Sequence, residues 1–399
     1  MKSYSKGKIP QIIFGSKKTN ELIHYLLSSN VHKCLIVSDS RMIEHNISIE
    51  MLKMLDEAKI AYEIYSEVNS EPTDQMCLEV SHLIKENHYE AVIGLGGGSP
   101  MDAAKAGSLI AGIPQEIKDL HQYGKSGNMM KEEWQRPCLL ILIPTTSGTG
   151  AETTASAVIS SVEHQLKFSF GNRNTSADLC IIDPMFTMGM PAMPTINGGL
   201  DAICHIAEIL VGTMANDYTN TILYECLKRV WKWLPVAVNE PDNLKAREQL
   251  SWAAHNALAN GGMPNGHAVA HALGSIYHIV HGQACIMVLP TVIRHFANDS
   301  KEAITNIGKI MNLEMEDDAI VNANKVADEI IRYYKILGVK NFNQTMQERN
   351  IQDSMEEFTE KMIPAILDDF KSKEWMPAIH TGDFKTKISK ICEMIYFEK

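Results

Sequence analysis

The chain has 399 residues, of which 45% are hydrophobic and 21% are charged, as expected for a globular protein large enough for two hydrophobic cores. Its formal net charge of −11, without a basic stripe, argues against nucleic acid or an anionic membrane as a partner. The first ten residues are polar, no apolar run could span a bilayer, and the eight cysteines form no CxxC pair, so we expect a cytoplasmic protein with reduced, buried thiols.

The first half of the chain predicts strands that alternate with helices. Short apolar runs bounded by turn residues are typical of buried parallel strands, and they occur at residues 33–38, 91–94, 138–143 and 179–182. Helical patterns at residues 51–58 and 76–87 lie between them. This alternation predicts a parallel α/β sheet.

After Asp183-Pro184 the pattern changes to consecutive amphipathic segments with hardly a strand signal. These predicted helices cover residues 201–211, 220–236, 244–259, 324–337 and 354–366. Prolines punctuate residues 184–195, which is typical of a boundary between domains. We therefore expect an α/β domain over residues 1–185 and an all-helical domain over residues 186–399.

Two polar turns follow predicted strands of the first domain. The first, Gly94–Asp102 (GLGGGSPMD), has glycines that allow close approach to a ligand, with Ser99 as the expected N-cap and Pro100 in the first helical turn. The exposed N–H groups and the helix dipole suit phosphate, although a tight turn without a ligand remains an alternative, because the motif is not GxGxxG. The second turn, Pro144–Gly150 (PTTSGTG), offers hydroxyls for phosphate, ribose or carboxamide, or is an N-cap-rich loop.

Asp39 follows the first predicted strand directly. A carboxylate at this place can accept hydrogen bonds from a ribose and would repel a 2′-phosphate, which favours NAD over NADP. A turn residue without a ligand is the alternative interpretation.

Histidines and one aspartate of the second half have the spacing of metal ligands. Asp201 and His205 are separated by four residues, as are His267 and His271, so each pair shares one face of a helix. His281 could join them only if the chain turned after His267, because fourteen residues of straight helix span about 21 Å. Gly274 is the expected helix end. One carboxylate and three imidazoles suit Fe²⁺ or Zn²⁺, whereas Mg²⁺ and Ca²⁺ prefer oxygen ligands.

With these motifs in this order, the chain resembles the iron-containing (group III) alcohol dehydrogenases, whose fold also occurs in glycerol dehydrogenases and dehydroquinate synthases. The resemblance covers essentially the whole chain and is carried by residues 94–105 (GLGGGSPMDAAK), 144–152 (PTTSGTGAE), 199–208 (GLDAICHIAE) and 267–282 (HAVAHALGSIYHIVHG). It implies an α/β dinucleotide-binding domain with a parallel sheet, an all-α C-terminal domain, and a homo-oligomer, a dimer or larger.

The resemblance also implies roles for individual residues. The metal, Fe²⁺ or Zn²⁺, would be held by Asp201, His205, His267 and His281, with His271 beside the substrate as the catalytic residue. The residues implied to face NAD(H) are Asp39, Gly97, Gly98, Ser99, Asp102, Thr145, Thr146, Thr149 and Lys167.

The chain departs from the family pattern near the expected substrate, at Ser156, Pro264 and Asn265. Glu71 and Asn197 are further departures. These changes leave the metal set intact, so we expect hydride transfer between NAD(H) and a short, polar-substituted aldehyde or its primary alcohol. The alternatives are a non-redox lyase of the dehydroquinate synthase kind, which also uses a metal and NAD, and a non-catalytic nucleotide-binding protein.

Overall fold

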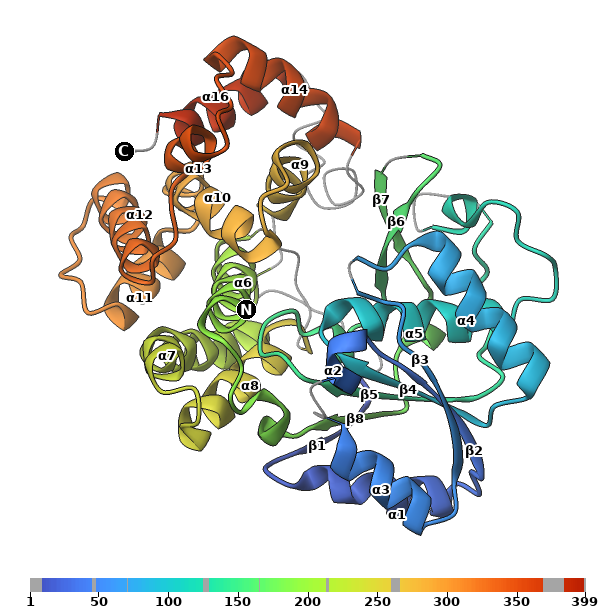
Figure 1. The fold of residues 1–399 in the computed structure, drawn as a ribbon. Helices are drawn as coiled ribbons and strands as arrows, with labels where there is room; N and C mark the ends of the chain where they lie inside the picture. The colour runs from blue at the N-terminus through green and yellow to red at the C-terminus, as the bar shows by residue number, and fades with distance from the viewer. Residues whose placement is uncertain are drawn as a thin grey trace. The chain divides into compact units, whose positions relative to one another are not determined.

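The computed structural model describes residues 9–44, 48–69, 71–124, 129–164, 166–212, 215–259, 266–368 and 384–397, which form two compact units (Figure 1). The α/β unit contains residues up to Met190 together with Asp242–Ala259. The helical unit contains Pro191–Pro241 and the described residues from 266 onward. The predicted fold class, a parallel α/β unit followed by a helical one, is confirmed.

The α/β unit is built on a six-stranded, entirely parallel sheet with the strand order β1-β8-β5-β4-β2-β3. Its strands are β1 (Gln11–Phe14), β2 (Lys33–Val37), β3 (Ala61–Tyr65), β4 (Ala91–Gly96), β5 (Leu139–Pro144) and β8 (Leu179–Ile182). The four predicted strands are confirmed. The prediction omitted β1 and β3, which are the edge strands and contain no fully buried residue.

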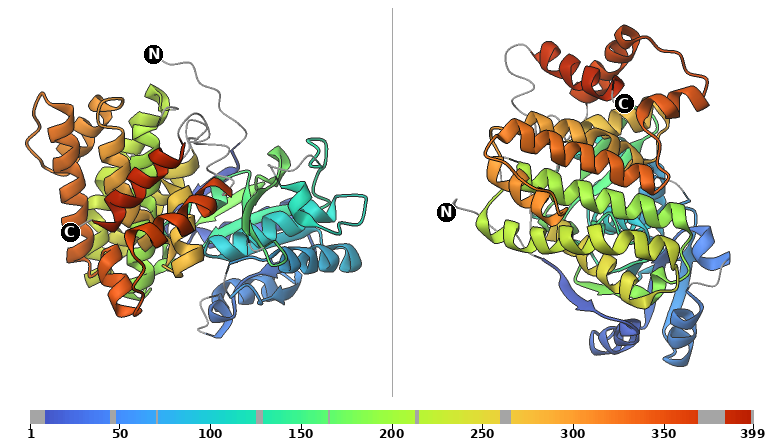
Figure 2. Two further views of the ribbon diagram at one scale, coloured as in Figure 1. Left: turned by 90° about the horizontal axis from the view of Figure 1, so that it is seen from above. Right: turned by 90° about the vertical axis from the view of Figure 1, so that its left-hand side faces the viewer.

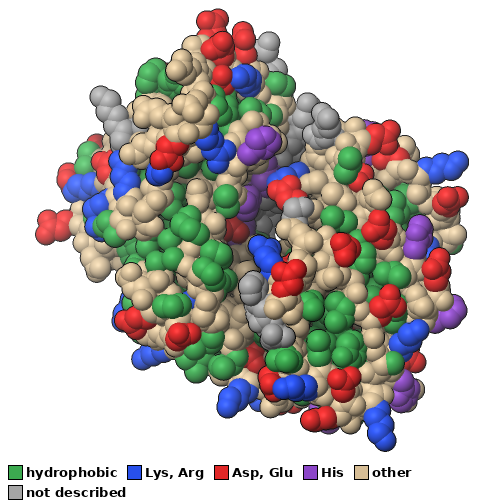
Figure 3. All heavy atoms as spheres, viewed as in Figure 1, with side chains coloured by type: hydrophobic (Ala, Val, Ile, Leu, Met, Phe, Trp, Pro, Cys, Tyr) green, Lys and Arg blue, Asp and Glu red, His purple; other side chains and the backbone are tan. Residues whose placement is uncertain are grey.

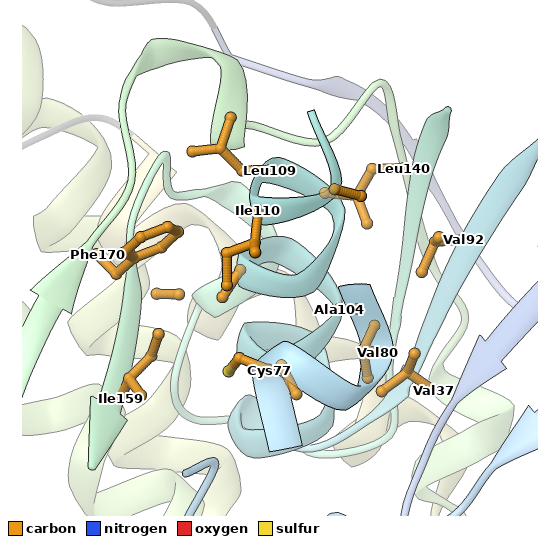
Figure 4. Packing of buried hydrophobic residues seen from close by; sticks show 14 of the residues in the cluster. Val37, Cys77, Val80, Val92, Ala104, Leu109, Ile110, Leu140, Ile159 and Phe170 are labelled. Carbon is orange, nitrogen blue, oxygen red and sulfur yellow. The ribbon is translucent and has the colours of Figure 1, made fainter. Parts of the chain in front are cut away.

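Helices cover both faces of this sheet (Figures 1 and 2). Side chains alternate along a strand, so Cys34 and Ile36 of β2 join one hydrophobic core and Leu35 and Val37 the other. The first core packs against α1 (Glu21–Ser28) and α3 (Ile49–Glu57), and the second against α4 (Asp74–Asn87) and α5 (Gly98–Ala111). Figure 4 shows part of the second core. A short helix, α2 (Ser40–Glu44), follows β2.

The sequence did not predict one hairpin of the α/β unit, and it placed one predicted helix in the other domain. An antiparallel hairpin of β6 (Ala157–Ser161) and β7 (Leu166–Phe170) adds Ile159 and Phe170 to the core beside α5 (Figure 4). Helix α8 (Leu244–Ala259) groups with this unit, although it lies beyond the boundary we placed after residue 185. Ser251 of α8 explains part of this, since its hydroxyl lies 2.9 Å from that of Ser147. Short 3₁₀ helices occupy Lys18–Asn20, Leu120–Tyr123, Ala151–Thr153, Arg173–Thr175 and Pro184–Thr187.

The described part of the helical unit consists of helices without a strand. They are α6 (Ala192–Val211), α7 (Asp217–Asn239), α9 (His267–Tyr277), α10 (His281–His295), α11 (Lys301–Ile310), α12 (Ala319–Ile336), α13 (Phe342–Glu348), α14 (Met355–Asp368) and α16 (Phe384–Tyr396). Helix α6 lies between α7 and α10, and it begins nine residues earlier than the segment predicted at 201 (Figures 1 and 2).

The helices of this unit approach closely where glycines face a neighbour. A Cβ atom at Gly199 of α6 would lie 2.4 Å from Leu234 of α7, and one at Gly282 of α10 would lie 2.1 Å from the carbonyl oxygen of Asn197. The side chain of Asn197 accepts a hydrogen bond from Gln283 at 3.1 Å. These contacts fix α10 against α6, the two helices that carry most of the candidate ligands.

The surface of each unit carries charges of both signs. On the face drawn in Figure 3, acidic and basic side chains are interspersed over the described residues of each unit. Among the described helices, none combines the length and the apolar character that crossing a bilayer requires.

Candidate metal centre and dinucleotide site

Asp201 and His205 lie on one face of α6, as their spacing predicts. Both side chains are buried, and His205 Nε2 is 3.8 Å from Asp201 Oδ1. The helix begins after Pro191, whose ring suits the start of a helix, so both residues lie well inside regular helix.

His267 and His281 reach the same carboxylate from two different helices. His267 is the first residue of α9 and His281 the first of α10, and the Nε2 atoms of both lie 3.4 Å from Asp201 Oδ1. The predicted turn between them is confirmed, but not its place. Gly274 lies inside α9, and the helix ends at His278, which adopts a left-handed conformation with φ 53°. Aromatic stacking also joins the helices, with the rings of His205 and His267 4.5 Å apart.

The Asp201 carboxylate is the common centre of this arrangement. Its Oδ1 atom is buried and makes no hydrogen bond to any described residue. Burial opposes its ionisation, but the imidazoles of His205 and His281 outweigh that effect and hold the Asp201 pKa well below its usual range. An ionised, buried oxygen surrounded by imidazole nitrogens fits a divalent cation with nitrogen and oxygen ligands, such as Fe²⁺ or Zn²⁺.

Glu208 contacts the imidazole of His267 at the ring nitrogen that does not face Asp201. The sequence analysis did not predict this contact. Glu208 is fully buried on α6, and its Oε2 atom lies 3.0 Å from His267 Nδ1. The same oxygen accepts a 2.6 Å hydrogen bond from the backbone N–H of Gly266. A carboxylate on the far nitrogen of a histidine fixes the tautomer and orientation of a metal-binding ring. The signal was present in the sequence, because Glu208 follows His205 by one helical turn.

His271 and Cys285 lie beside His281, one of the candidate ligands. The His271 ring, on α9, is buried and lies 5.4 Å from the His281 ring. Cys285, one turn after His281 on α10, places Sγ 3.6 Å from His281 Nε2. Burial alone would lower the pKa of His281, but Cys285 and Asp201 raise it to about 9. The sequence prediction treated Cys285 only as a buried thiol.

A second cluster of possible ligands lies in the α/β unit. The ligand atoms of Asp119, His121 and His164 lie within 4.8 Å of one another, and His164 Nε2 is 3.2 Å from Asp119 Oδ2. The Asp119 pKa is lowered, since hydrogen bonds from Gln122, His121 and His164 outweigh the opposing effect of burial. These three side chains are partly exposed, as is His281, whereas Asp201, His205, His267 and Cys285 are buried.

The residues predicted to face a dinucleotide lie mainly at the carboxyl ends of the neighbouring strands β2, β4 and β5. Gly97 follows β4 and Thr145 follows β5, and Thr145 N donates a 2.9 Å hydrogen bond to Gly96 O. A Cβ atom at Gly98 would lie 3.0 Å from Thr149, and one at Gly97 would lie 3.7 Å from Thr146. The two polar turns therefore meet, and this edge of a parallel sheet is where such folds bind ligands.

One local prediction in the first turn is wrong. The N-cap of α5 is Gly97, without a side-chain cap, so Ser99 lies in the first turn of the helix. The glycine that this turn requires is Gly96, which has φ 147°, a conformation that residues with a side chain rarely adopt. The backbone N–H groups of this turn meet no capping side chain, the arrangement that helix N-termini use for phosphate.

Asp39 and Asp102 already have partners within the unit. Asp39 follows β2, and its Oδ1 atom accepts hydrogen bonds from the backbone N–H and the guanidinium of Arg41. Asp102 accepts from Lys105 Nζ at 2.9 Å and from Val158 N at 3.0 Å, which ties α5 to β6. The role of each in dinucleotide binding remains a prediction.

The remaining predicted residues are spread over the structure or lie outside it. Lys167, on β7, forms an ion pair with Glu71. Ser156 precedes β6, and its hydroxyl is hydrogen bonded to that of Ser169. Pro264 and Asn265 lie outside the described residues.

Comparisons with known proteins agree with this organisation. The family model for iron-containing alcohol dehydrogenase matches residues 10–184, and the model for the C-terminal part of the same family matches residues 195–374. The aldehyde-alcohol dehydrogenase of Streptococcus pneumoniae is 32% identical over 67% of this chain, and the chain spans 31% of that relative's length. The NAD-dependent methanol dehydrogenase of Bacillus methanolicus is 27% identical over 83% of this chain and 86% of its own.

A solved structure described as 1,3-propanediol oxidoreductase superposes with a TM-score of 0.85. It covers 99% of this chain and 100% of its own, at 24% identity, and so shows the same fold. The two family models together match most of both units, from the strand that opens the sheet to α14 of the helical unit. The chain belongs to the iron-containing alcohol dehydrogenase family.

Proposed function

We propose that the protein is a metal-dependent alcohol dehydrogenase that uses NAD(H) to interconvert a short aldehyde and its primary alcohol. The observation that carries this proposal is the convergence of His267 and His281 on the buried Asp201 oxygen, each at 3.4 Å, with His205 at 3.8 Å. Family membership supports it, as does the relative named an NAD-dependent methanol dehydrogenase.

Residues of the helical unit have separate roles in this proposal. Asp201, His205, His267 and His281 would hold Fe²⁺ or Zn²⁺, and Glu208 keeps His267 in position. A divalent cation at this place supplies a Lewis acid that draws electrons from a carbonyl oxygen. The balanced reaction, aldehyde plus NADH plus H⁺ giving alcohol plus NAD⁺, also needs a proton donor.

His271 is the group we assign to proton transfer. It is buried beside His281, and an imidazole exchanges protons near neutral pH, so it can deliver the proton that the alcohol oxygen gains and remove it in the reverse direction.

The α/β unit would bind the dinucleotide through the two turns that meet at the ends of β4 and β5. Gly97 and Gly98 leave backbone N–H groups open to the pyrophosphate, and Ser99, Thr145, Thr146 and Thr149 add hydroxyls. Asp39 favours the free ribose hydroxyls of NAD over a 2′-phosphate. Asp102 and Lys167 are part of the same proposal.

We further propose that the substrate carries a polar or anionic group, selected by Ser156, Pro264 and Asn265. The family pattern commonly has a small apolar segment where Pro264 and Asn265 stand. The amide of Asn265 and the hydroxyl of Ser156 favour a hydroxyl, carboxylate or sulfonate on the aldehyde. Measuring kcat/KM for butanal against such aldehydes tests this, and a clear preference for butanal would contradict it.

The protein is also proposed to be a cytoplasmic homo-oligomer. All eight cysteines are free, which fits a reducing compartment, and family resemblance favours a dimer or larger. Light scattering of the purified protein measures the oligomeric state, and a monomer would contradict that part.

The variant Asp201→Asn tests the main proposal. Loss of the negative charge should abolish Zn²⁺ retention and NADH oxidation with aldehydes while NADH binding, followed by fluorescence, persists. Asp217→Asn, an exposed aspartate in the first turn of α7, is the matched control and should behave as the unmodified chain. Full activity of metal-free Asp201→Asn would refute the assignment. The lyase and non-catalytic alternatives predict no aldehyde-dependent NADH oxidation in the unmodified protein, and neither family model supports them.

A further inference from the structure

Cys285 shares a face of α10 with His281, because the two are four residues apart in a helix. The cysteine is fully buried. Its Sγ atom lies 3.6 Å from the same His281 Nε2 atom that faces Asp201 Oδ1 at 3.4 Å. The thiol therefore faces the candidate metal centre instead of the surrounding hydrophobic core.

The separations match those of ligands around one ion. Tetrahedral bonds of about 2.05 Å to imidazole nitrogen, 2.1 Å to carboxylate oxygen and 2.3 Å to sulfur place an N···O pair about 3.4 Å apart and an N···S pair about 3.6 Å apart. The observed pairs, 3.4 Å for His267 and His281 with Asp201 and 3.6 Å for His281 with Cys285, are close to these values. Sγ also lies 3.9 Å from His281 Nδ1, so the thiol contacts the side of the ring, and the His281 ring has to turn for Nε2 and Sγ to bind one ion.

The four ligand atoms of Asp201, His267, His281 and Cys285 also lie within 4.8 Å of one another. Asp201 Oδ1, almost wholly buried and without a hydrogen bond to any described residue, faces the space that these atoms surround. His205 Nε2 lies 3.8 Å from this oxygen. With the same bond lengths, this separation requires an angle of about 130° between the metal–oxygen and metal–nitrogen bonds, which a fifth ligand can adopt.

We propose that Cys285 is a direct metal ligand, binding through its thiolate in the substrate-free protein together with Asp201, His267, His281 and the more distant His205. The proposal rests on the metal site of the proposed function and adds a sulfur atom to it. Sulfur ligands favour Zn²⁺ and Co²⁺ over hard ions such as Mn²⁺, so Cys285 also sets which metal the site prefers.

Co²⁺ is the probe, because a bound thiolate gives a charge-transfer band in the near ultraviolet and a tetrahedral or five-coordinate site gives visible d–d bands. The unmodified chain should show both after anaerobic loading. Cys285→Ala should keep d–d bands, shifted in position, and lose the charge-transfer band. Cys226→Ala, which removes another buried thiol of the helical unit on α7, is the matched control and should keep both.

The same variants test the preference between metals. Cys285→Ala should weaken Zn²⁺ binding by more than about tenfold, the lower limit for losing even an outer-sphere partner, while Mn²⁺ binding changes much less. Equal losses for the two ions would contradict a direct sulfur bond. Thermal unfolding of the metal-free variants checks that both cysteine substitutions leave the fold intact.

The second cluster could also take up Co²⁺, so each titration is repeated in a His164→Ala background, which removes that site. In this background, d–d bands without a charge-transfer band in the otherwise unmodified chain would overturn the role of Cys285 and leave the metal site intact. Absence of all bands, with no cobalt retained, would overturn both this proposal and the metal site of the proposed function.

Discussion

The contact between Glu208 and His267 yields the most quantitative prediction. In Glu208→Gln the side chain keeps its shape, but only its single amide oxygen can accept a hydrogen bond. The native Oε2 atom accepts from Gly266 N at 2.6 Å and contacts His267 Nδ1 at 3.0 Å. An amide oxygen at the place of Oε2 can keep both contacts, but the amide is neutral, so His267 loses the negative charge of its partner. Such losses typically weaken metal binding ten- to hundredfold, equivalent to about 1.4–2.7 kcal/mol.

Competition with a chromogenic chelator measures the Zn²⁺ affinity of Glu208→Gln. The matched control is Glu225→Gln on α7, where the glutamate is partly exposed and pairs with Arg229 at 2.9 Å. The control should bind Zn²⁺ as the unmodified chain does. If Glu208 only supported the packing of α6 and α9, Glu208→Gln would lower the melting temperature of the metal-free protein and leave its Zn²⁺ affinity unchanged. That result would refute the reasoning.

Three further predictions follow from the packing and the pKa shifts. Gly282→Ala should destabilise the helical unit by about 1–3 kcal/mol in denaturant unfolding, because its Cβ atom would lie 2.1 Å from Asn197 O; unchanged stability would contradict this contact. Metal binding should release about one proton at pH 7 and strengthen roughly tenfold per pH unit up to about 9, because His281, with its pKa raised to about 9, must lose its proton first. Calorimetry in two buffers that differ in ionisation enthalpy measures this proton. Burial raises the Glu152 pKa from 4.5 to about 7, so the stability contributed by its neutral form is present below pH 4.5 and is lost as the pH rises through 7. The free energy of unfolding of Glu152→Gln, relative to that of the unmodified chain, should therefore be up to about 3 kcal/mol more favourable at pH 8 than at pH 4. The same difference between the two proteins at both pH values would contradict the pKa shift.

The sequence predicted the sheet where strands are buried on both sides. Central strands such as β4 and β5 are continuous apolar runs, whereas the edge strand β3 (AYEIY) mixes polar and apolar residues without a clear period. The β6–β7 hairpin escaped prediction for the same reason, since Ser160, Ser161 and Lys167 interrupt its apolar pattern.

Spacing along the chain predicted the ligand candidates better than the turns between them. The four-residue interval of Asp201 and His205 needs only regular helix, but the end of α9 depends on tertiary contacts. Gly274 offered the local signal, yet the helix continues to Tyr277 and is ended by a left-handed His278. The assignment of α8 to the α/β unit likewise depends on contacts such as that of Ser251, which no local pattern reports.

The contacts around the ligand candidates were the least predictable part of the site. Glu208 and Cys285 stand one helical turn after His205 and His281, so both were visible as neighbours on the same faces. A glutamate in a helix is usually exposed, and a lone cysteine is usually a small buried residue without a polar role. Only the packing of the helices shows that Glu208 is buried against His267 and that the Cys285 thiol lies beside His281.

Anomalous diffraction from Zn²⁺- or Fe²⁺-loaded crystals, recorded above and below the absorption edge of the metal, tests the central claim most directly. The account predicts a single strong peak in the helical unit, at bonding distance from Asp201 Oδ1 and from the Nε2 atoms of His205, His267 and His281. A loaded crystal with no peak there, or with its only peak beside Asp119 and His164, would contradict it.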